Sequence, residues 1–128
     1  MTLLVDTHLL IWAAAMPDRL SPEARTLLTD PDHDLVFSAA SLWEISIKLG
    51  LGRDDFRVDP RLLRRGLIAN GYRELPVTGA HPLELERLPA HHRDPFDRIL
   101  VCQARVEGIT LLTSDETVAR YGPPVRLV

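Results

Sequence analysis

The chain has 128 residues, and 45% of them are hydrophobic, which predicts a single folded domain over residues 1–128 rather than a disordered chain. No apolar run reaches the roughly 18 residues that a membrane helix needs, and Cys102, the single cysteine, excludes an intrachain disulfide. The net charge of −3 argues against general nucleic-acid affinity unless the acids gather at one site. Because the start also lacks a signal-peptide pattern, we expect a cytoplasmic protein without a membrane anchor.

Short apolar runs alternate with helical patterns in the first half of the chain. Serine before proline and serine after an apolar run are both typical of helix starts. The predicted elements are a strand at 3–5, a helix at 7–15, a helix from Ser21, a strand at 35–37, a helix from Ser38 that stops at Gly50, and a loop at 51–59.

The second half continues the same alternation. The predicted elements are a helix from Asp59 to 70–71, a short edge strand at 74–77 that contains Pro76, a helix at 78–87, a loop around 91–93, a helix from Asp94 to Gly108, and strands at 109–113 and 125–128. Uninterrupted apolar strands are typical of a parallel sheet that helices cover on both faces. We therefore expect an α/β fold, a three-layer α/β/α sandwich with a mostly parallel central sheet.

Four acids occupy positions that such a fold brings to one edge. Asp6 follows the first strand, and Asp115 follows the strand at 109–113. Glu44 lies about two turns into the helix after the second strand, and Asp97 lies in the first turn of the helix from Asp94. Because the carboxyl ends of parallel strands share one edge, we expect these side chains to converge there.

Each of these acids has an ordinary structural alternative, because an acid directly after a strand is often the N-cap of the next helix and Asp97 has the N3 position of a near capping box that begins at Asp94. Asp115 has the position of a helix N-cap, and Asp94, followed by proline, has the same position. Glu44 and Lys48 have the spacing of a surface ion pair on one helix. The sequence leaves these alternatives open.

Asp97 shares a helical stripe with Val101 and Ala104, which predicts that it faces the sheet. Asp6 follows a strand expected at the centre of the sheet, so both carboxylates should be buried, which is costly without a partner. Arg93 and Arg98 are within reach along the chain, but clustered carboxylates also repel one another. A divalent cation would offset both the cost of burying these charges and the repulsion between them. Oxygen ligands favour Mg²⁺ or Mn²⁺. Such an ion can orient a phosphodiester and activate water.

Four segments, LLVDTH ending at His8, SAASLWEI ending at Ile45, HRDPFDR ending at Arg98 and LTSD ending at Asp115, resemble motifs of the VapC-like ribonuclease toxins in the PIN domain family. The resemblance covers nearly the whole chain. It implies Asp6, Glu44, Asp97 and Asp115 as the metal-binding acids. Asp94 competes with Asp97 for the third position; we favour Asp97 as the ligand and Asp94 as a helix cap that helps through a water.

The same resemblance implies further properties of the protein. They are a Mg²⁺- or Mn²⁺-dependent endoribonuclease activity on structured RNA such as tRNA or rRNA, and a role as the toxin of a toxin–antitoxin pair. They also include a homodimer, and inhibition by a small VapB-like antitoxin whose tail enters the acid site. Two alternatives remain: a phosphatase with an aspartate nucleophile, and a non-catalytic binding module. The phosphatase is disfavoured because His8 stands where its second acid would, and no lysine follows Lys48.

Three other features have no assigned role. Five arginines between Arg53 and Arg65 form either a solvated face or a patch that contacts phosphate or an antitoxin. His91 and His92 are a weak indication of zinc, since only one cysteine accompanies them. The two tryptophans, Trp12 and Trp43, are expected in the core or at an interface. The arginines in question are Arg53, Arg57, Arg61, Arg64 and Arg65.

Overall fold

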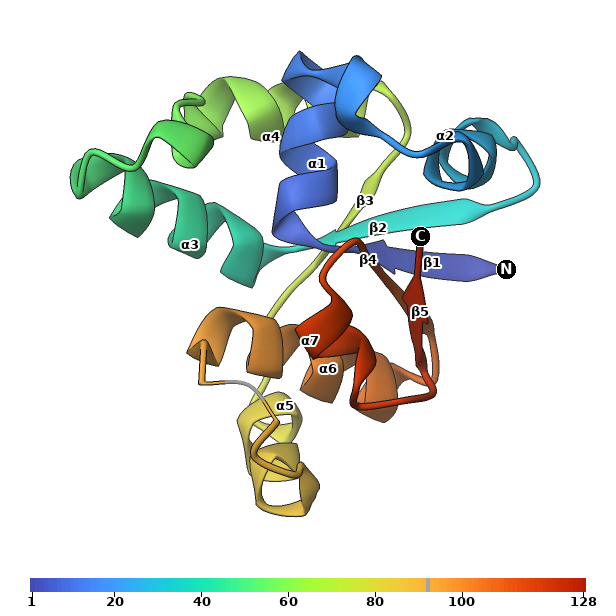
Figure 1. The fold of residues 1–128 in the computed structure, drawn as a ribbon, viewed down its shortest axis with the longest axis vertical. Coiled ribbons are helices and arrows are strands. Elements are labelled where there is room, and N and C mark those ends of the chain that lie inside the picture. Colours follow the sequence, from blue (N-terminus) through green and yellow to red (C-terminus); the bar gives the residue numbers. More distant parts are fainter. Residues whose placement is uncertain (92) are drawn as a thin grey trace.

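The computed structural model of the chain describes residues 1–91 and 93–128. A five-stranded sheet lies at the centre, with strand order β3-β2-β1-β4-β5, and each pair of neighbouring strands is parallel (Figure 1). The strands are β1 (Thr2–Val5), β2 (Asp34–Ser38), β3 (Arg73–Leu75), β4 (Thr110–Thr113) and β5 (Val125–Leu127).

Helices cover both faces of this sheet. In Figure 1, α1 to α4 lie on one side and α5 to α7 on the other, which confirms the predicted three-layer α/β/α sandwich. The α-helices are α1 (Thr7–Ala15), α2 (Pro22–Thr29), α3 (Ala39–Gly50), α4 (Pro60–Ala69), α5 (Ala80–Leu83), α6 (Pro95–Glu107) and α7 (Glu116–Ala119), and the 3-10 helices are η1 (Pro17–Arg19), η2 (Asp54–Phe56) and η3 (Glu84–Arg87).

Alternating side chains of the central strand supply two separate cores. Leu3 and Val5 of β1 pack in the core beneath α1 to α4, whereas Leu4 packs against α6 on the other face. All three side chains are fully buried. Successive strand residues point to opposite faces, so a strand covered on both sides must be apolar throughout. This explains why the apolar runs of the sequence predicted a buried parallel sheet.

Side-chain caps fix where the predicted helices begin. Ser21 accepts a hydrogen bond from the backbone N–H of Ala24, and Ser38 accepts one from Ala40. Asp59 and Asp94 cap α4 and α6 in the same manner. These four starts were predicted from the residue types alone.

Several predicted boundaries are wrong. β3 ends at Leu75 instead of continuing to residue 77, because Pro76 has no backbone N–H to donate to the sheet. The helix expected at 78–87 is divided into α5 and η3, and the loop expected at 51–59 contains η2. Neither η1 nor α7 was predicted.

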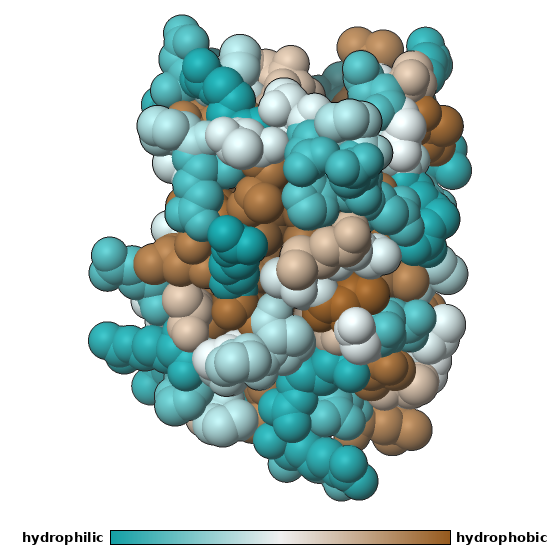
Figure 2. Space-filling view, turned by 90° about the vertical axis from the view of Figure 1, so that its right-hand side faces the viewer, coloured by the Kyte–Doolittle hydropathy of each residue, from teal (hydrophilic) through white to brown (hydrophobic). Residues whose placement is uncertain are grey.

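The two tryptophans differ from each other. Trp12 packs against the core beneath α1, as expected, whereas 63% of Trp43 is exposed, so Trp43 does not belong to the core. Figure 2 shows the face that carries both termini, where hydrophobic side chains form patches separated by hydrophilic ones. Among the described residues, the helices are too short or too polar for one to cross a membrane.

Candidate active site

Two of the predicted acids lie at the carboxyl ends of the neighbouring strands β1 and β4. Asp6 directly follows β1, and its backbone N–H donates to the carbonyl of Leu112 at 3.1 Å. The hydroxyl of Thr113 donates to Asp6 Oδ2 at 2.5 Å and accepts from the backbone N–H of Asp115 at 3.0 Å. A single buried hydroxyl therefore connects both acids at this edge.

Asp6 is buried, with 5% of its surface exposed. Its second oxygen, Oδ1, accepts from the backbone N–H of Leu9 at 3.0 Å and so caps α1. Burial raises the pKa of Asp6 above its ordinary value, although the hydrogen bonds from Thr113 and Leu9 act in the opposite direction. The nearby charge of Glu44 raises this pKa further.

The ion pair that the spacing of Glu44 and Lys48 allowed is present, but it does not lie on the surface, since Glu44 is only 2% exposed. Lys48 Nζ makes this partly buried contact with Glu44 Oε2 at 2.5 Å and also reaches Asp94 Oδ2 at 3.1 Å. The other oxygen of Glu44, Oε1, is buried and has no hydrogen-bond partner among the described residues. The i,i+4 spacing indicated the first contact of Lys48 but not the second.

Asp94 is the N-cap of α6, as its sequence position predicted. Its Oδ1 accepts from the backbone N–H of Phe96 at 2.8 Å, and its Oδ2 accepts from Lys48. Burial alone would raise the pKa of Asp94, but the hydrogen bonds from Phe96 and Lys48 hold it below its ordinary value. This carboxylate is therefore ionised at neutral pH.

Asp97 lies in the first turn of α6, on the same stripe as the fully buried Val101 and Ala104, but it is half-buried rather than buried as the sequence predicted. Burial and then the charges of the four other acids raise its pKa from an ordinary 3.8 to about 8. Because Coulomb repulsion between carboxylates weakens with distance, these effects indicate that the other four acids lie in the neighbourhood of Asp97. The five, called the acid cluster below, are Asp6, Glu44, Asp94, Asp97 and Asp115.

Asp115 lies at the exposed margin of the acid cluster. Its side chain accepts from the backbone N–H of Thr117 at 2.8 Å and caps α7, so the ordinary capping explanation holds for this residue. Its charge nevertheless contributes to the raised pKa of Asp97. Asp115 thus both caps α7 and contributes its charge to the acid cluster.

The acid cluster has the chemistry of a site for hard cations. Its donors are all carboxylate oxygens, which suit Mg²⁺ or Mn²⁺, and the open Oε1 of Glu44 is a buried acceptor that a cation would satisfy. Within residues 1–91 and 93–128, however, no three acidic, histidine or cysteine side chains already stand together as a metal-binding group. The side chains gather at one edge without forming a finished ligand shell.

The other candidate residues lie outside this arrangement. His91 contacts the ring of Tyr121, and His92 falls outside the described residues. Within the arginine group, three members form exposed ion pairs, which is consistent with a solvated face. These pairs are Arg53 with Asp55, Arg57 with Asp54, and Arg64 with Glu74.

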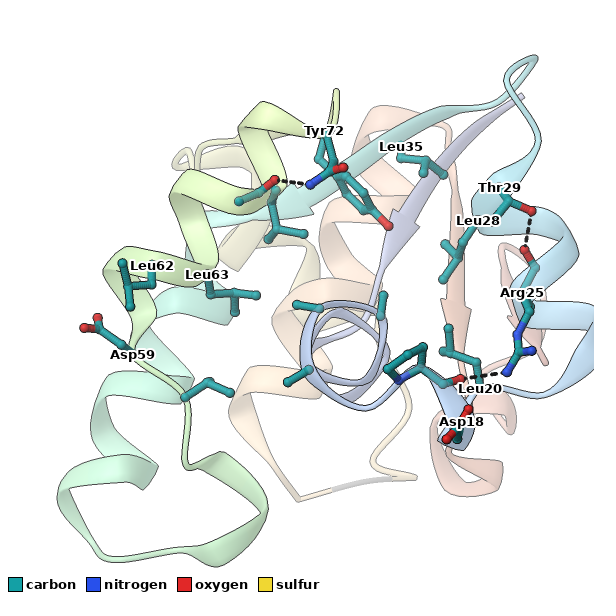
Figure 3. A pocket seen from close by; sticks show the side chains of 18 residues that line it. Asp18, Leu20, Arg25, Leu28, Thr29, Leu35, Asp59, Leu62, Leu63 and Tyr72 are labelled. Atoms are coloured by element: carbon teal, nitrogen blue, oxygen red, sulfur yellow. Dashed lines mark hydrogen bonds between the residues drawn. The ribbon is translucent and has the colours of Figure 1, made fainter.

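A cavity of about 870 Å³ lies between α1, α2 and α4 (Figure 3), and its lining does not include a member of the acid cluster. Leucines from several elements line it, including Leu28 and Leu63. Its polar side chains have local roles, since Asp59 caps α4 and Arg25 donates to the carbonyl of Pro17.

Comparison with known proteins places the chain in a family. The PIN domain model matches residues 3–122. The whole chain superposes on 98% of a chain in the crystal structure of VapBC2 from Rickettsia felis bound to a DNA fragment from their promoter, with a TM-score of 0.70 and 13% identity. It also superposes on 97% of a chain in the structure of VapBC-1 from nontypeable Haemophilus influenzae, with a TM-score of 0.66 and 18% identity. No curated protein matches. The chain belongs to the PIN domain family.

Proposed function

We propose that the protein is a metal-dependent endoribonuclease whose active site is the acid cluster. The observation that carries the proposal is the approach of acids from distant segments at the carboxyl ends of β1 and β4, where Asp6 is buried and Glu44 Oε1 is buried without a partner among the described residues. Burial and four neighbouring carboxylates raise the pKa of Asp97 there to about 8. Acids packed so closely are stable in their ionised form only with a cation between them. Membership of the PIN domain family supports the same activity.

In this proposal Asp6, Glu44, Asp97 and Asp115 hold Mg²⁺ or Mn²⁺. A bound ion of this kind polarises a phosphodiester and lowers the pKa of a bound water. Thr113 fixes the orientation of Asp6, and the capping hydrogen bond fixes Asp115. Asp94, which Lys48 and the Phe96 N–H keep ionised, can orient the attacking water and accept its proton.

We further propose that the protein is the toxin of a toxin–antitoxin pair in the cytoplasm. The two structural relatives are VapBC assemblies, and one of them is bound to a promoter DNA fragment. A small VapB-like antitoxin would inhibit by placing a basic tail in the acid cluster, whose negative charge attracts such a side chain. The proposed substrate is a structured RNA such as tRNA or rRNA, and the proposed assembly is a homodimer.

The acid variants Asp6→Asn and Asp97→Asn test the activity. Each should reduce cleavage of host RNA in the presence of Mn²⁺ or Mg²⁺ by at least about 100-fold, because each removes a charged ligand. EDTA should abolish cleavage by the wild type. Expression of the wild type, but not of either variant, should arrest growth of the host. Circular dichroism checks that both variants are folded.

Asp32→Asn is the matched control, since Asp32 is exposed in the turn before β2 and outside the acid cluster. This variant should cleave RNA like the wild type. Equal RNA cleavage by wild type and Asp97→Asn would contradict the proposal, and no cleavage by either would favour a binding module. Turnover of small phosphomonoesters would favour the phosphatase. In the structure, His8 stands where the second acid of a phosphatase would, and its Nε2 lies 3.3 Å from Asp55 Oδ2.

A further inference from the structure

Lys48, the only lysine of the chain, lies inside the acid cluster. It comes one turn after Glu44 on α3, and its side chain is 14% exposed. Its ammonium lies between Glu44 Oε2 at 2.5 Å and Asp94 Oδ2 at 3.1 Å, and so connects α3 to the start of α6. This bridge between two carboxylates is the arrangement that a metal ion often adopts.

Two aromatic rings enclose the same ammonium group. Nζ lies 4.8 Å from the ring centroid of Phe56 and 5.7 Å from that of Phe96. The faces of aromatic rings attract cations, so four groups hold the charge of Lys48 in place. Burial acts to lower the pKa of Lys48, but Glu44 and Asp94 outweigh it and raise this pKa above its ordinary value. The bridge is therefore a charged one.

The contacts of Lys48 divide the acid cluster into two parts. Glu44 and Asp94 each use one oxygen to bind the ammonium. Glu44 Oε1 remains buried without a partner among the described residues, although Oε2 of the same carboxylate is paired. The ammonium thus pairs with Oε2 of Glu44 and leaves Oε1 of the same carboxylate available to a second cation.

We propose that the Lys48 ammonium is a built-in cation of the acid cluster, which takes the place of a second metal ion between Glu44 and Asp94 and limits the site to one divalent ion. This inference rests on the proposed function, because it takes the acid cluster as the metal site. It makes Lys48 a positioning residue that orients Glu44 so that Oε1 faces the divalent ion. It also predicts that a second ion binds when the ammonium is removed.

Metal titration without RNA tests the proposal on the full chain. Isothermal titration calorimetry with Mn²⁺ should give one ion bound to the wild type and two to Lys48→Met, which keeps the length of the side chain without its charge. Lys48→Arg keeps the charge and should bind one ion. Arg64→Met is the matched control, because it removes a cation from the exposed Arg64–Glu74 pair, and it should also bind one ion.

Thermal unfolding separates this role from a merely structural one. In EDTA, Lys48→Met should melt below the wild type, because Glu44 and Asp94 lose their partner. Saturating Mn²⁺ should close most of this gap, since an ion that binds only the folded state stabilises it. A variant that is unfolded in EDTA should fold when Mn²⁺ is added.

Three results would overturn the inference. They are one Mn²⁺ bound by Lys48→Met, two bound by the wild type, and a melting deficit of Lys48→Met that Mn²⁺ leaves unchanged. If Lys48→Met binds one ion, or if Mn²⁺ leaves its melting deficit unchanged, the proposed nuclease activity still stands, provided that the wild type binds one ion and cleaves RNA. A wild type that binds no Mn²⁺ would instead overturn the metal dependence of the proposed function and this inference together.

Discussion

Thr113 holds two acids of the cluster with one hydroxyl group, which makes it a sensitive residue at the strand ends. Thr113→Val keeps the shape of the side chain but removes the hydrogen bonds to Asp6 and Asp115. Because the oxygen of Asp6 is buried, we expect a loss of about 1–3 kcal/mol in the free energy of unfolding. Urea denaturation measures this loss.

Thr113→Ser is the matched comparison, since it keeps the hydroxyl and removes one methyl group. It should cost about 1 kcal/mol, the usual loss for one buried carbon. A Thr113→Val variant as stable as the wild type would show that the hydroxyl contributes nothing to the folded state, contrary to the geometry.

Single residues also show what the sequence could and could not predict about the site. Asp6 and Asp94 were placed by local rules, since one follows an apolar strand and the other precedes a proline. The contact between Lys48 and Asp94 joins residues 46 apart and depends on how α3 and α6 approach each other. No local pattern encodes that approach. The pairing of Lys48 with Glu44 could therefore be predicted from the sequence, whereas the contact of Lys48 with Asp94 could not.

Secondary-structure elements were predicted well where a residue type marks their end. Gly108 has a φ of 66°, which favours glycine, and it ends α6 as predicted. β3 and α7 contain only three and four residues, too few for a hydrophobic period to develop. The bounds of β3 were accordingly wrong, and α7 was not predicted.

Two glycines in different helical positions provide a test at the scale of elements. Gly66 lies inside α4 with ordinary helical backbone, and nothing lies within 4 Å of a Cβ placed there. Gly66→Ala should raise the free energy of unfolding by about 0.5–1 kcal/mol, because alanine loses less conformational entropy in a helix. Gly108→Ala should lower it by about 1–2 kcal/mol, because its φ is positive.

Chemical denaturation of the two glycine variants checks both the predicted increase and the predicted decrease in the free energy of unfolding. Far-ultraviolet circular dichroism confirms that their helix content matches the wild type. Destabilisation by Gly66→Ala would mean that α4 does not continue through this residue.

At the scale of the whole molecule, the strand order explains why the acids meet. From β1 the chain passes to β2 and β3 on one side, then returns to β4 and β5 on the other. In open parallel sheets, sites form outside the carboxyl ends of the strands where the order reverses. Asp6 follows β1 and Asp115 follows β4, the two strands that flank this point. The sequence predicted that the acids lie at the carboxyl edge of the sheet, but the order of the strands is known only from the structure.

The charge of the acid cluster should make the stability of the metal-free protein depend on pH. In the folded protein the pKa of Asp97 is about 8, whereas in the unfolded chain it should lie near its ordinary value of 3.8. Between these values the folded state binds more protons, so stability is greatest below about pH 4 for this group and falls as pH rises toward 8. Asp94 and Asp55, whose pKa values are lowered, titrate at lower pH and do not oppose this trend.

Urea denaturation in EDTA at several values between pH 5 and 8 measures the effect. The change in the free energy of unfolding with pH should differ between Asp97→Asn and the wild type by at most about 1.4 kcal/mol per pH unit, the value for one proton. Asp6, whose pKa burial also raises, contributes in the same direction, so the variant retains part of the slope. Asp32→Asn should follow the wild type.

Saturating Mn²⁺ should reverse the pH dependence of the wild type. The ion competes with protons for the carboxylates, so it binds more tightly as pH rises and stabilises the folded state most near pH 8. Asp97→Asn lacks one of the competing sites, and its gain from Mn²⁺ should be smaller at each pH. If the wild type and this variant gain equally, Asp97 is not a ligand, and the raised pKa reflects burial and repulsion alone.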